Sequence, residues 1–407
     1  MKIMFATELF WGLEEKLFGR EYVLGTTAIY DVAKNWTEDN EVICFREMPL
    51  GWGEWLSYKV KSIFGHTSIY DSIPAYYEAD GIKVYCLKYI KYLHRGIIGK
   101  FFYKRFATKI NNKLKAINWE PDVIVAHMPT MNAMFYIGMI EGNATKIAVL
   151  HSGDLVQLFD GEKIVKRKAA LLEANFDRIF SRSQVIYNRA QAIGLSNLTS
   201  DIVSSAIPMY GRSERDWGNL KERKINILYA GSLIERKGVQ QILKAVAQLV
   251  DKYTIELPII GSGNYEKKLK QLVQILQIED HVEFMGKKSR ETVYDYMRKA
   301  DIFITPSYQE TLGLVYLEAM LAGCITIGSR GEGIDGIIID GENGYLIDPY
   351  SLEEITECME KVINMSQNEL EQVSNKAVRT AMFYNEENIS DHYLKLIEKT
   401  VSESGKF

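Results

Sequence analysis

Two glutamates eight residues apart, Glu310 and Glu318, stand in the segment TPSYQETLGLVYLEAMLAG. Apolar residues recur around them at helical spacing, after a short apolar run typical of a buried strand. Eight residues of helix span about 12 Å, so we expect Glu310 at the start of a helix and Glu318 two turns along it. Helix N-termini offer free N–H groups to anions. The groups expected here belong to Thr311, Leu312 and Gly313.

This spacing predicts a ligand that carries both a phosphate and a hydroxylated end. The phosphate would meet the helix start, and the hydroxyl groups would meet the second carboxylate. The alternative is a pair of solvated glutamates on the surface of an ordinary helix, since most carboxylates are exposed.

A basic pair occupies a second candidate position, in the segment YAGSLIERKG that ends at Gly238. The pattern is typical of a strand, a turn freed by Gly231, and a helix start, with Arg236 and Lys237 just before the helix. Cations beside a helix N-terminus stabilise phosphate charge. We therefore expect a diphosphate clamp here, and the alternative is an exposed basic pair.

Two histidines follow buried apolar strands directly. His127 comes after PDVIVA and His151 after KIAVL, with Asp154 three residues later. Ligands of open α/β sheets bind beyond the carboxyl ends of the strands, so both histidines fall where a site is expected. A structural histidine is the alternative, and it applies most strongly to His127.

Composition excludes several classes of protein. The chain has 407 residues, a net charge of −4 and 47% apolar residues, which indicates two or three domains and no general binding of polyanions. No apolar run reaches membrane-spanning length, and the N-terminus reads as a first strand rather than a signal peptide. The four cysteines lack metal-ligand spacing, and no Asp-x-Asp motif occurs, so we expect a cytoplasmic protein without a metal site.

Basic charge is concentrated in residues 81–119, from Gly81 to Trp119. This stretch holds ten Lys or Arg and no Asp or Glu, with aromatic residues interleaved, whereas the rest of the chain has 39 basic and 53 acidic residues. One interpretation is a solvated helix face over an aromatic core, and the other is contact with an anionic membrane surface. Nucleic acid is not expected, because no recognisable nucleic-acid module accompanies the patch.

Strands and helices alternate in both halves, which predicts α/β folding with doubly wound parallel sheets. A polar stretch broken by Pro and Gly, residues 204–224, separates the halves. We therefore expect two Rossmann-like domains that face a cleft. Gly261-Ser262-Gly263 follows a strand of the second half, but it lacks the third glycine and later acid of a dinucleotide fingerprint, so a redox enzyme is disfavoured.

These motifs resemble those of the retaining family 4 glycosyltransferases of the GT-B fold, in the class of glycosyl transferases group 1. Glu310 and Glu318 match its E-x7-E signature, and CITIGSRGEGIDGIIIDGENGYLIDP continues the match. The turn at Gly231 resembles a second signature, in which Lys237 matches the phosphate-binding lysine and Ser232 replaces a frequent arginine. The resemblance weakens before residue 92, where isolated glycines such as Gly12 replace a Gly-Gly loop.

The resemblance implies an acceptor-binding domain over residues 1–204, a nucleotide-sugar-binding domain over 205–384, and a C-terminal helix, 385–407, that packs back on the first domain. It further implies retaining, metal-independent transfer of a hexosyl group from a UDP- or GDP-sugar to a glycan or lipid-linked acceptor. The process would belong to surface polysaccharide or glycoconjugate biosynthesis. No cofactor is expected, and the basic stretch would allow peripheral contact with the inner face of an anionic membrane.

The roles implied by the resemblance are carried over residue by residue. The catalytic group comprises Glu310, His151 and Lys237. The donor-binding group comprises Gly231, Ser232, Arg236, Lys237, Gly261, Thr311, Leu312, Gly313 and Glu318. The acceptor side comprises Gly12, His127 and Asp154.

Two other classes of protein stay open. One is a nucleotide-sugar epimerase or hydrolase of GT-B fold, and the other is a non-catalytic GT-B subunit that binds a partner enzyme. The intact Lys237 and both glutamates argue against the subunit, whereas Ser232 leaves room for it.

Overall fold

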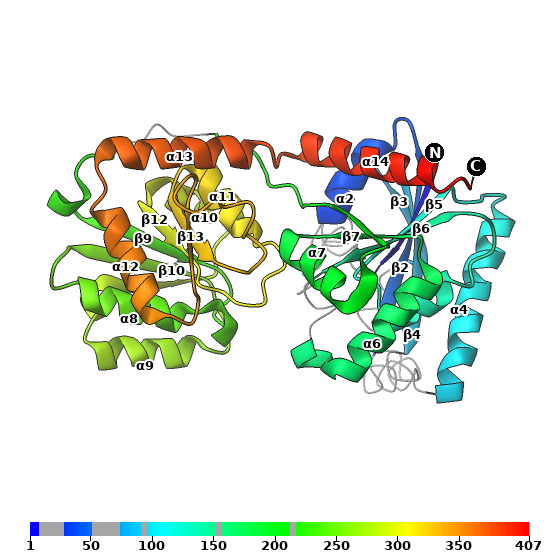
Figure 1. Cartoon of the computed structure of the whole chain (residues 1–407), viewed down its shortest axis with the longest axis horizontal. Coiled ribbons are helices and arrows are strands. Elements are labelled where there is room, and N and C mark those ends of the chain that lie inside the picture. The colour runs from blue at the N-terminus through cyan, green and yellow to red at the C-terminus, as the bar shows by residue number, and fades with distance from the viewer. Residues whose placement is uncertain (8–27, 51–73, 91–95, 152–156, 212–216, 407) are drawn as a thin grey trace. The chain divides into compact units, whose positions relative to one another are not determined.

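A computed structural model describes residues 1–7, 28–50, 74–90, 96–151, 157–211 and 217–406 (Figure 1). Contacts divide the chain into two compact units. The N-terminal unit comprises Met1–Arg182, Ile186–Ser205 and Glu386–Phe407, and the C-terminal unit comprises Ser183–Val185 and Ala206–Asn385. The boundaries expected from the sequence fall after residues 204 and 384.

The N-terminal unit is built on an eight-stranded sheet of order β3-β4-β2-β1-β5-β6-β7-β8. Its strands are β1 (Lys2–Thr7), β2 (Glu41–Leu50), β3 (Tyr76–Ala79), β4 (Ile82–Ile90), β5 (Val123–His127), β6 (Thr145–Leu150), β7 (Arg178–Ser181) and β8 (Thr199–Ile202). All neighbouring pairs are parallel except β3 with β4, an antiparallel hairpin at the edge that the sequence did not predict. The central strands carry continuous apolar runs, such as IMFA in β1 and VIVA in β5, because both faces of the sheet are covered.

Helices cover this sheet. They are α2 (Ala28–Ala33), α4 (Gly96–Ala116), α5 (Met131–Ile137), α6 (Gln157–Asn175), α7 (Gln184–Ala190) and the C-terminal α14 (Glu386–Glu403). One core joins the sheet to α4, α5 and α6 through Ile110, Tyr136 and Leu172, each at most 1% exposed. The carboxyl ends of β5 and β6 are thereby fixed.

The last helix, α14, packs on the N-terminal unit beside α2 (Figure 1). Trp36 Nε1 donates a hydrogen bond of 3.1 Å to the carbonyl of Ser390, and Ser390 Oγ donates one of 2.9 Å to the carbonyl of Val32. Farther along, Thr145 Oγ1 donates to Ser404 Oγ at 2.8 Å. These contacts confirm the predicted return of the C-terminal helix to the first domain.

The C-terminal unit is built on a six-stranded, wholly parallel sheet of order β11-β10-β9-β12-β13-β14. Its strands are β9 (Ile225–Ala230), β10 (Ile255–Ile260), β11 (Val282–Gly286), β12 (Ile302–Ile304), β13 (Ile325–Ser329) and β14 (Tyr345–Ile347). Its helices are α8 (Val239–Leu249), α9 (Glu266–Leu276), α10 (Arg290–Lys299), α11 (Leu314–Ala322), α12 (Leu352–Ile363) and α13 (Gln367–Met382).

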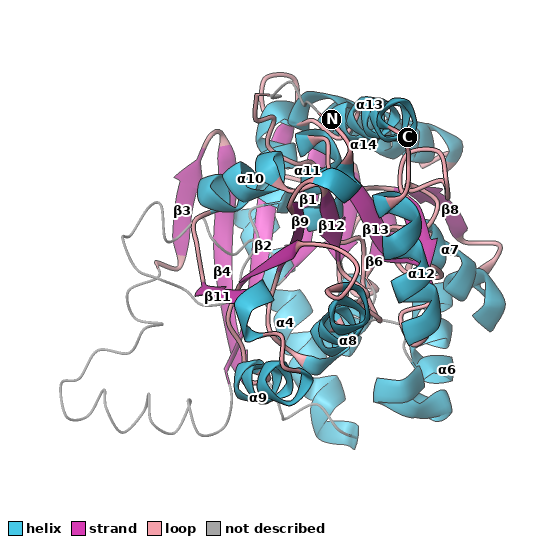
Figure 2. Ribbon diagram, turned by 90° about the vertical axis from the view of Figure 1, so that its left-hand side faces the viewer, coloured by secondary structure: helices cyan, strands magenta, loops and turns pink. Residues whose placement is uncertain are grey.

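Successive residues of β9 serve opposite faces of this sheet, as strand geometry requires. Ile227 and Tyr229 belong to a core with α8, α9 and α12, whereas Leu228 and Ala230 belong to a core with α10, α11 and α13. In Figure 2, α10 and α11 lie above the strands and α8 and α9 below them. The doubly wound fold predicted from the alternation of strands and helices is confirmed.

The basic stretch contributes α4, whose inner face is apolar. Tyr103 stacks on Phe135 with ring centroids 4.8 Å apart, and Phe106 meets Tyr136 edge-on at 4.8 Å. Lys104, Arg105 and Lys109 are exposed on the same helix. In this described part of α4, basic side chains therefore face solvent over an aromatic core, which was one of the two interpretations of the sequence.

Candidate functional site

The site elements of the C-terminal unit gather where β9, β10 and β12 end side by side. The loop after β9 donates from Gly231 N to the carbonyl of Ile260 at 2.9 Å and from Leu233 N to the carbonyl of Ser262 at 3.0 Å. A Cβ on Gly261 would lie 1.8 Å from the carbonyl oxygen of Gly231. The two predicted donor-binding glycines, Gly231 and Gly261, thus permit backbone contact between the two loops.

The predicted phosphate clamp lies on a short 3-10 turn, Glu235–Lys237, before α8. Gly238 ends this turn with φ at 69°, and a Cβ there would lie 2.2 Å from the carbonyl oxygen of Pro306. Tyr308 N also donates to the carbonyl of Arg236 at 2.9 Å. The basic pair is therefore held against the loop that follows β12, which is the loop of Glu310.

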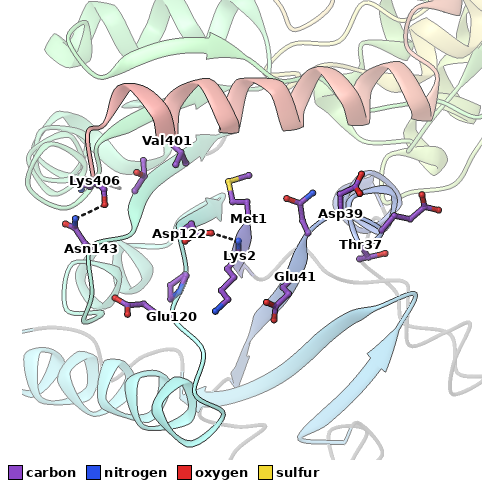
Figure 3. Close-up of a pocket in the computed structure, with 14 residues that line it drawn as sticks. Met1, Lys2, Thr37, Asp39, Glu41, Glu120, Asp122, Asn143, Val401 and Lys406 are labelled. Carbon is purple, nitrogen blue, oxygen red and sulfur yellow. Dashed lines mark hydrogen bonds between the residues drawn. The ribbon is translucent and has the colours of Figure 1, made fainter.

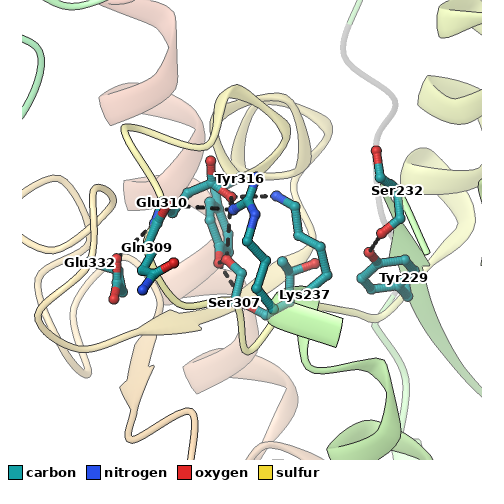
Figure 4. Close-up of polar contacts among 10 residues, drawn as sticks. Tyr229, Ser232, Lys237, Ser307, Gln309, Glu310, Tyr316 and Glu332 are labelled. Atoms are coloured by element: carbon teal, nitrogen blue, oxygen red, sulfur yellow. Dashed lines mark hydrogen bonds and ion pairs between the residues drawn. The ribbon is translucent and has the colours of Figure 1, made fainter. Parts of the chain in front are cut away.

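Both cations of the clamp face one carboxylate, and Figure 4 shows Lys237 beside Glu310. Lys237 Nζ forms an ion pair with Glu310 Oε2, and Arg236 Nη1 lies 3.8 Å from the same oxygen. The side chains of Lys237 and Glu310 are only 14% and 13% exposed. The structure therefore brings the residues of two sequence motifs, 73 positions apart, into direct contact.

Ser232, which replaces a frequent arginine, lies on the other side of the same loop (Figure 4). Its side chain is exposed, and its carbonyl accepts a hydrogen bond of 2.9 Å from Tyr229 OH. Ser232 thus leaves the positive charge of this loop to Arg236 and Lys237.

The predicted helical position of Glu310 is wrong. Helix α11 begins at Leu314, and Gly313 is its N-cap with φ at 76°. Gln309 also has a positive φ, 58°, so the chain turns twice before the helix starts. A Cβ on Gly313 would lie 2.5 Å from the ring of Tyr316, which explains the left-handed glycine. Glu310 consequently lies in a loop with Thr311 and Leu312 (residues 310–312), and only Glu318 is on the helix.

Glu332 holds the loop of Glu310 and was not identified from the sequence. Its Oε2 accepts a hydrogen bond of 2.8 Å from the backbone N–H of Glu310 (Figure 4). Next to it, a Cβ on Gly333 would lie 2.3 Å from the carbonyl oxygen of Thr311, so the segment packs directly against the loop. In the sequence, Glu332 fell within the segment that continues the family match, but no spacing marked it as a partner of Glu310.

Tyr316 supports the same loop through its hydroxyl group. Its hydroxyl donates to the carbonyl of Thr305 at 2.5 Å and lies 3.0 Å from Ser307 Oγ. Burial raises the pKa of the Tyr316 phenol well above its ordinary value, so the group stays a neutral donor. Ser307 Oγ is in turn 3.5 Å from Glu310 Oε2. Sequence periodicity marked this part of the helix as core but gave no reason to assign the tyrosine a polar role.

Glu318 is buried on α11, with 8% exposure, and is paired with Arg290 at the start of α10. Arg290 Nε donates to Glu318 Oε1 at 2.7 Å, and Arg290 Nη2 contacts the same oxygen. The guanidinium group, itself half exposed, thus fixes the orientation of the carboxylate. Arg290 was not identified as a site residue from the sequence.

The histidines of the N-terminal unit lie together at the carboxyl ends of β5 and β6. His127 is 1% exposed, and its Nδ1 lies 3.4 Å from His151 Nε2. Burial lowers the pKa of both imidazoles well below their ordinary value, so both are neutral near pH 7. Such burial leaves His127 no exposed surface for an acceptor, and the structural alternative fits its position.

The other acceptor-side residues, Gly12 and Asp154, lie outside the described residues. A hollow of about 680 Å³ in the N-terminal unit lies at the opposite, amino ends of β1 and β5 (Figure 3). Lys2, Glu120 and Asp122 line it, far from the strand ends that carry the histidines. Because sheets of this kind bind ligands at their carboxyl ends, we assign no role to this hollow.

Within the described ranges, no helix is long and apolar enough to cross a membrane. Across those same residues, His, Cys, Asp and Glu side chains form no group of three that could hold a metal ion.

The sequence and the fold of the chain are similar to those of known glycosyltransferases. Residues 212–380 match the family described as Glycosyl transferases group 1. The chain is 24% identical over 313 residues to an uncharacterized glycosyltransferase of Methanocaldococcus jannaschii, covering 72% of this chain and 78% of that one. It is 30% identical over 166 residues to the lipopolysaccharide glucosyltransferase WaaG of Escherichia coli, covering 40% of this chain and 44% of that protein.

The fold resembles that of Anabaena HepE in complex with UDP, with a TM-score of 0.70 and 16% identity over 98% of this chain and 100% of that one. Residues 212–380 therefore match the glycosyl transferases group 1 family, and the two units of the chain have the GT-B fold. All of the predicted donor-binding residues lie within the matched range.

Proposed function

We propose that this protein is a glycosyltransferase that moves a sugar from a UDP- or GDP-sugar to a glycan or lipid-linked acceptor, in the biosynthesis of surface polysaccharide or another glycoconjugate. The observation that carries the proposal is the contact of Lys237 and Arg236 with Glu310, inside the matched domain. A cationic pair at the ends of parallel strands suits a diphosphate.

In this proposal the diphosphate takes the place of Glu310 as the partner of Lys237. Two cations then neutralise the charge that develops on the leaving phosphate, which is where transition-state stabilisation has its largest effect. Glu310, released from the ion pair, accepts hydrogen bonds from hydroxyl groups of the sugar. Glu318, held at Oε1 by Arg290, accepts hydrogen bonds from the ribose diol.

The proposed reaction breaks the bond between the anomeric carbon and the diphosphate oxygen. The acceptor oxygen forms its bond to the same carbon from the same face, and its proton passes to the leaving phosphate oxygen. Retention of configuration and independence of metal are parts of the proposal. Their support is the E-x7-E pattern together with the protein cations at the expected phosphate position.

Product analysis tests this function directly. The protein would be incubated with each of a set of UDP- and GDP-sugars, with and without glycan and lipid-linked acceptors, in buffer containing EDTA. We expect a glycosylated product only with acceptor, with the anomeric configuration of the donor by NMR. Free sugar or an epimerised donor in the absence of acceptor would instead support the hydrolase or epimerase. No nucleotide-dependent rise in melting temperature would support the non-catalytic subunit.

We also propose peripheral contact of the exposed basic face of α4 with anionic lipid. Lys104, Arg105 and Lys109 are exposed there, whereas the neighbouring aromatic Tyr103 is buried, so the attraction would be electrostatic. Co-sedimentation with vesicles that contain anionic lipid should occur at low salt and disappear at high salt. No co-sedimentation at low salt, or binding that survives high salt, would contradict this contact.

A further inference from the structure

Three side chains from distant parts of the chain form one hydrogen-bonded row in the N-terminal unit. Tyr393 of α14 brings its hydroxyl to 2.8 Å from His127 Nε2, and His127 Nδ1 lies 3.4 Å from His151 Nε2. Tyr393 and His127 are separated by 266 residues. The row therefore exists only when the C-terminal helix packs against the carboxyl end of β5.

Aromatic rings hold this row in a buried setting. The ring of His127 lies 5.8 Å from that of Tyr393, and Trp36 meets Tyr393 edge-on at 5.3 Å. Tyr393 is 3% exposed. The nearby cation, Arg182, is also buried, and burial lowers its pKa to about 10. A neutral row is favoured here, since an imidazolium would be desolvated beside a guanidinium.

The direction of the hydrogen bonds follows from the tyrosine. Among the described residues, His127 Nε2 is the one hydrogen-bond partner of the Tyr393 hydroxyl. A buried hydroxyl needs an acceptor for its proton, so Tyr393 donates to Nε2. The single proton of neutral His127 then sits on Nδ1, from which it is directed at His151 Nε2. His151 consequently accepts at Nε2 and carries its own proton on Nδ1.

We propose that Tyr393 and His127 are positioning residues, which orient His151 and fix it as the Nδ1–H tautomer. The inference deepens the proposed function and rests on it for one point: His151, which the family resemblance places in the catalytic group, would border the transferred sugar. In that setting His151 Nδ1–H is a hydrogen-bond donor for a sugar oxygen. The C-terminal helix thereby serves the chemistry as well as the stability of the N-terminal unit.

The tautomers can be read in the unmodified protein. With ring-15N-labelled histidine, two-bond 1H–15N correlations distinguish a protonated from an unprotonated ring nitrogen at each of the six histidines. The replacements His127→Gln and His151→Gln would assign the two sets of signals. We expect protonated Nδ1 and unprotonated Nε2 in both residues at pH 7.5. A protonated Nε2 in either residue would overturn the proposal, and this result does not depend on any transfer activity.

Tyr393→Phe then tests the link to the reaction. We expect mixed tautomers at His127 and His151, and kcat lower by about tenfold or more, by analogy with the outer partners of metal-bound histidines. The KM for the donor should change less than kcat. Unchanged ring signals in Tyr393→Phe would overturn the proposed row.

Ser390→Ala is the matched control on the same helix. It removes a comparable buried hydrogen bond, from Ser390 Oγ to the carbonyl of Val32, without touching the row. We expect a similar fall in melting temperature but unchanged tautomers and kcat. Equal losses of kcat in Ser390→Ala and Tyr393→Phe would show a merely structural role for Tyr393. If the unmodified protein transfers no sugar, the proposed function is wrong. The NMR measurement of the tautomers still tests the hydrogen-bonded row, because it does not depend on transfer activity.

Discussion

The two units hold their candidate site residues in opposite ways. In the C-terminal unit, charged side chains face each other at the ends of strands and stay partly accessible, as the 14% exposure of Lys237 and 13% of Glu310 show. In the N-terminal unit, His127 and Tyr393 are neutral and almost completely buried, at 1% and 3%.

This difference suits the C-terminal site to ligand binding and the buried N-terminal hydrogen bonds to the orientation of a side chain. An accessible ion pair can exchange one partner for an anionic ligand, because the desolvation of both charges is incomplete and the ligand restores the charge balance. The buried pair of Tyr393 and His127 cannot contact a ligand, but it can fix the direction in which His151 donates. The comparison predicts that changes in the C-terminal unit act on donor binding and on the developing charge, whereas changes in the N-terminal row act on kcat.

Glu310→Gln should have the largest effect. The amide keeps the size of the side chain but loses its charge, so we expect transfer to fall by roughly 10² to 10³, as for other groups aligned with the reacting centre. Binding of UDP or GDP should not weaken, since Lys237 loses its competing carboxylate. Steady-state transfer rates and calorimetric titration measure the two effects.

Glu360→Gln is the control for that change, because Glu360 pairs with Lys252 on the surface of the same unit. Its transfer rate should stay within twofold of the original. Transfer by Glu310→Gln within threefold of the unmodified protein would contradict the role given to Glu310.

Glu332→Ala should have the next largest effect, because it leaves the N–H of Glu310 without its acceptor and frees the loop. We expect transfer to fall by about 30-fold, equivalent to the loss of roughly 2 kcal/mol for a hydrogen bond to a charged group. Glu332→Gln keeps an acceptor oxygen and should recover most of the rate. Equal rates for the Ala and Gln variants would exclude the hydrogen bond as the cause.

Arg290→Gln should act on the donor alone. Without the guanidinium group, Glu318 loses its fixed orientation toward the ribose, so the KM for the donor should rise by about tenfold with little change in kcat, the pattern of lost uniform binding. Arg298→Gln, which changes an exposed arginine at the other end of the same helix, is the control. A fall in kcat with unchanged KM would contradict this assignment.

The buried row should give the N-terminal unit a modest dependence on pH. Folding lowers the pKa of His127 well below the ordinary imidazole value of about 6.5. Below pH 6.5 the unfolded chain therefore binds more protons than the folded chain. Stability is then complete above that pH and falls as the pH decreases. Between pH 7 and 5.5 we expect His127 to account for a loss of about 1 kcal/mol, measured by hydrogen exchange of the β5 amides.

His127→Gln should remove this part of the pH dependence, while His392→Gln, at an exposed position of α14, should leave it unchanged. If the stability of all three proteins depends on pH in the same way, His127 is not the source of that dependence.

Much of the fold could be predicted from the sequence, because buried parallel strands are continuous apolar runs. VIVA of β5 and KIAVL of β6 were recognised in this way. The edge strand β3 was missed, since its four residues, YYEA, are half exposed and too few to show a period.

The site was predictable only in part, because its contacts are long-range. Lys237 and Glu310 could be selected by their motifs, but their ion pair joins residues 73 positions apart. The pair depends on the close approach of Gly238 to the loop that follows β12. Glu310 was assigned to a helix because positive φ values at Gln309 and Gly313 leave no trace in apolar periodicity. Tyr393 reads as an ordinary core position of a helix, and nothing near it in the sequence points to His127.

The most direct test of the account is calorimetric titration of UDP and GDP into the unmodified protein, Lys237→Ala and Lys252→Ala. Lys252 is the control, since it also forms an ion pair with a glutamate, at 2.9 Å, but lies away from the strand ends. We predict that one nucleoside diphosphate binds the unmodified protein and Lys252→Ala alike. Lys237→Ala should bind it about a hundredfold more weakly, the effect of roughly 3 kcal/mol expected when one side of a desolvated charge contact is removed. Equal affinity in all three proteins would contradict the phosphate clamp and, with it, the proposed donor site.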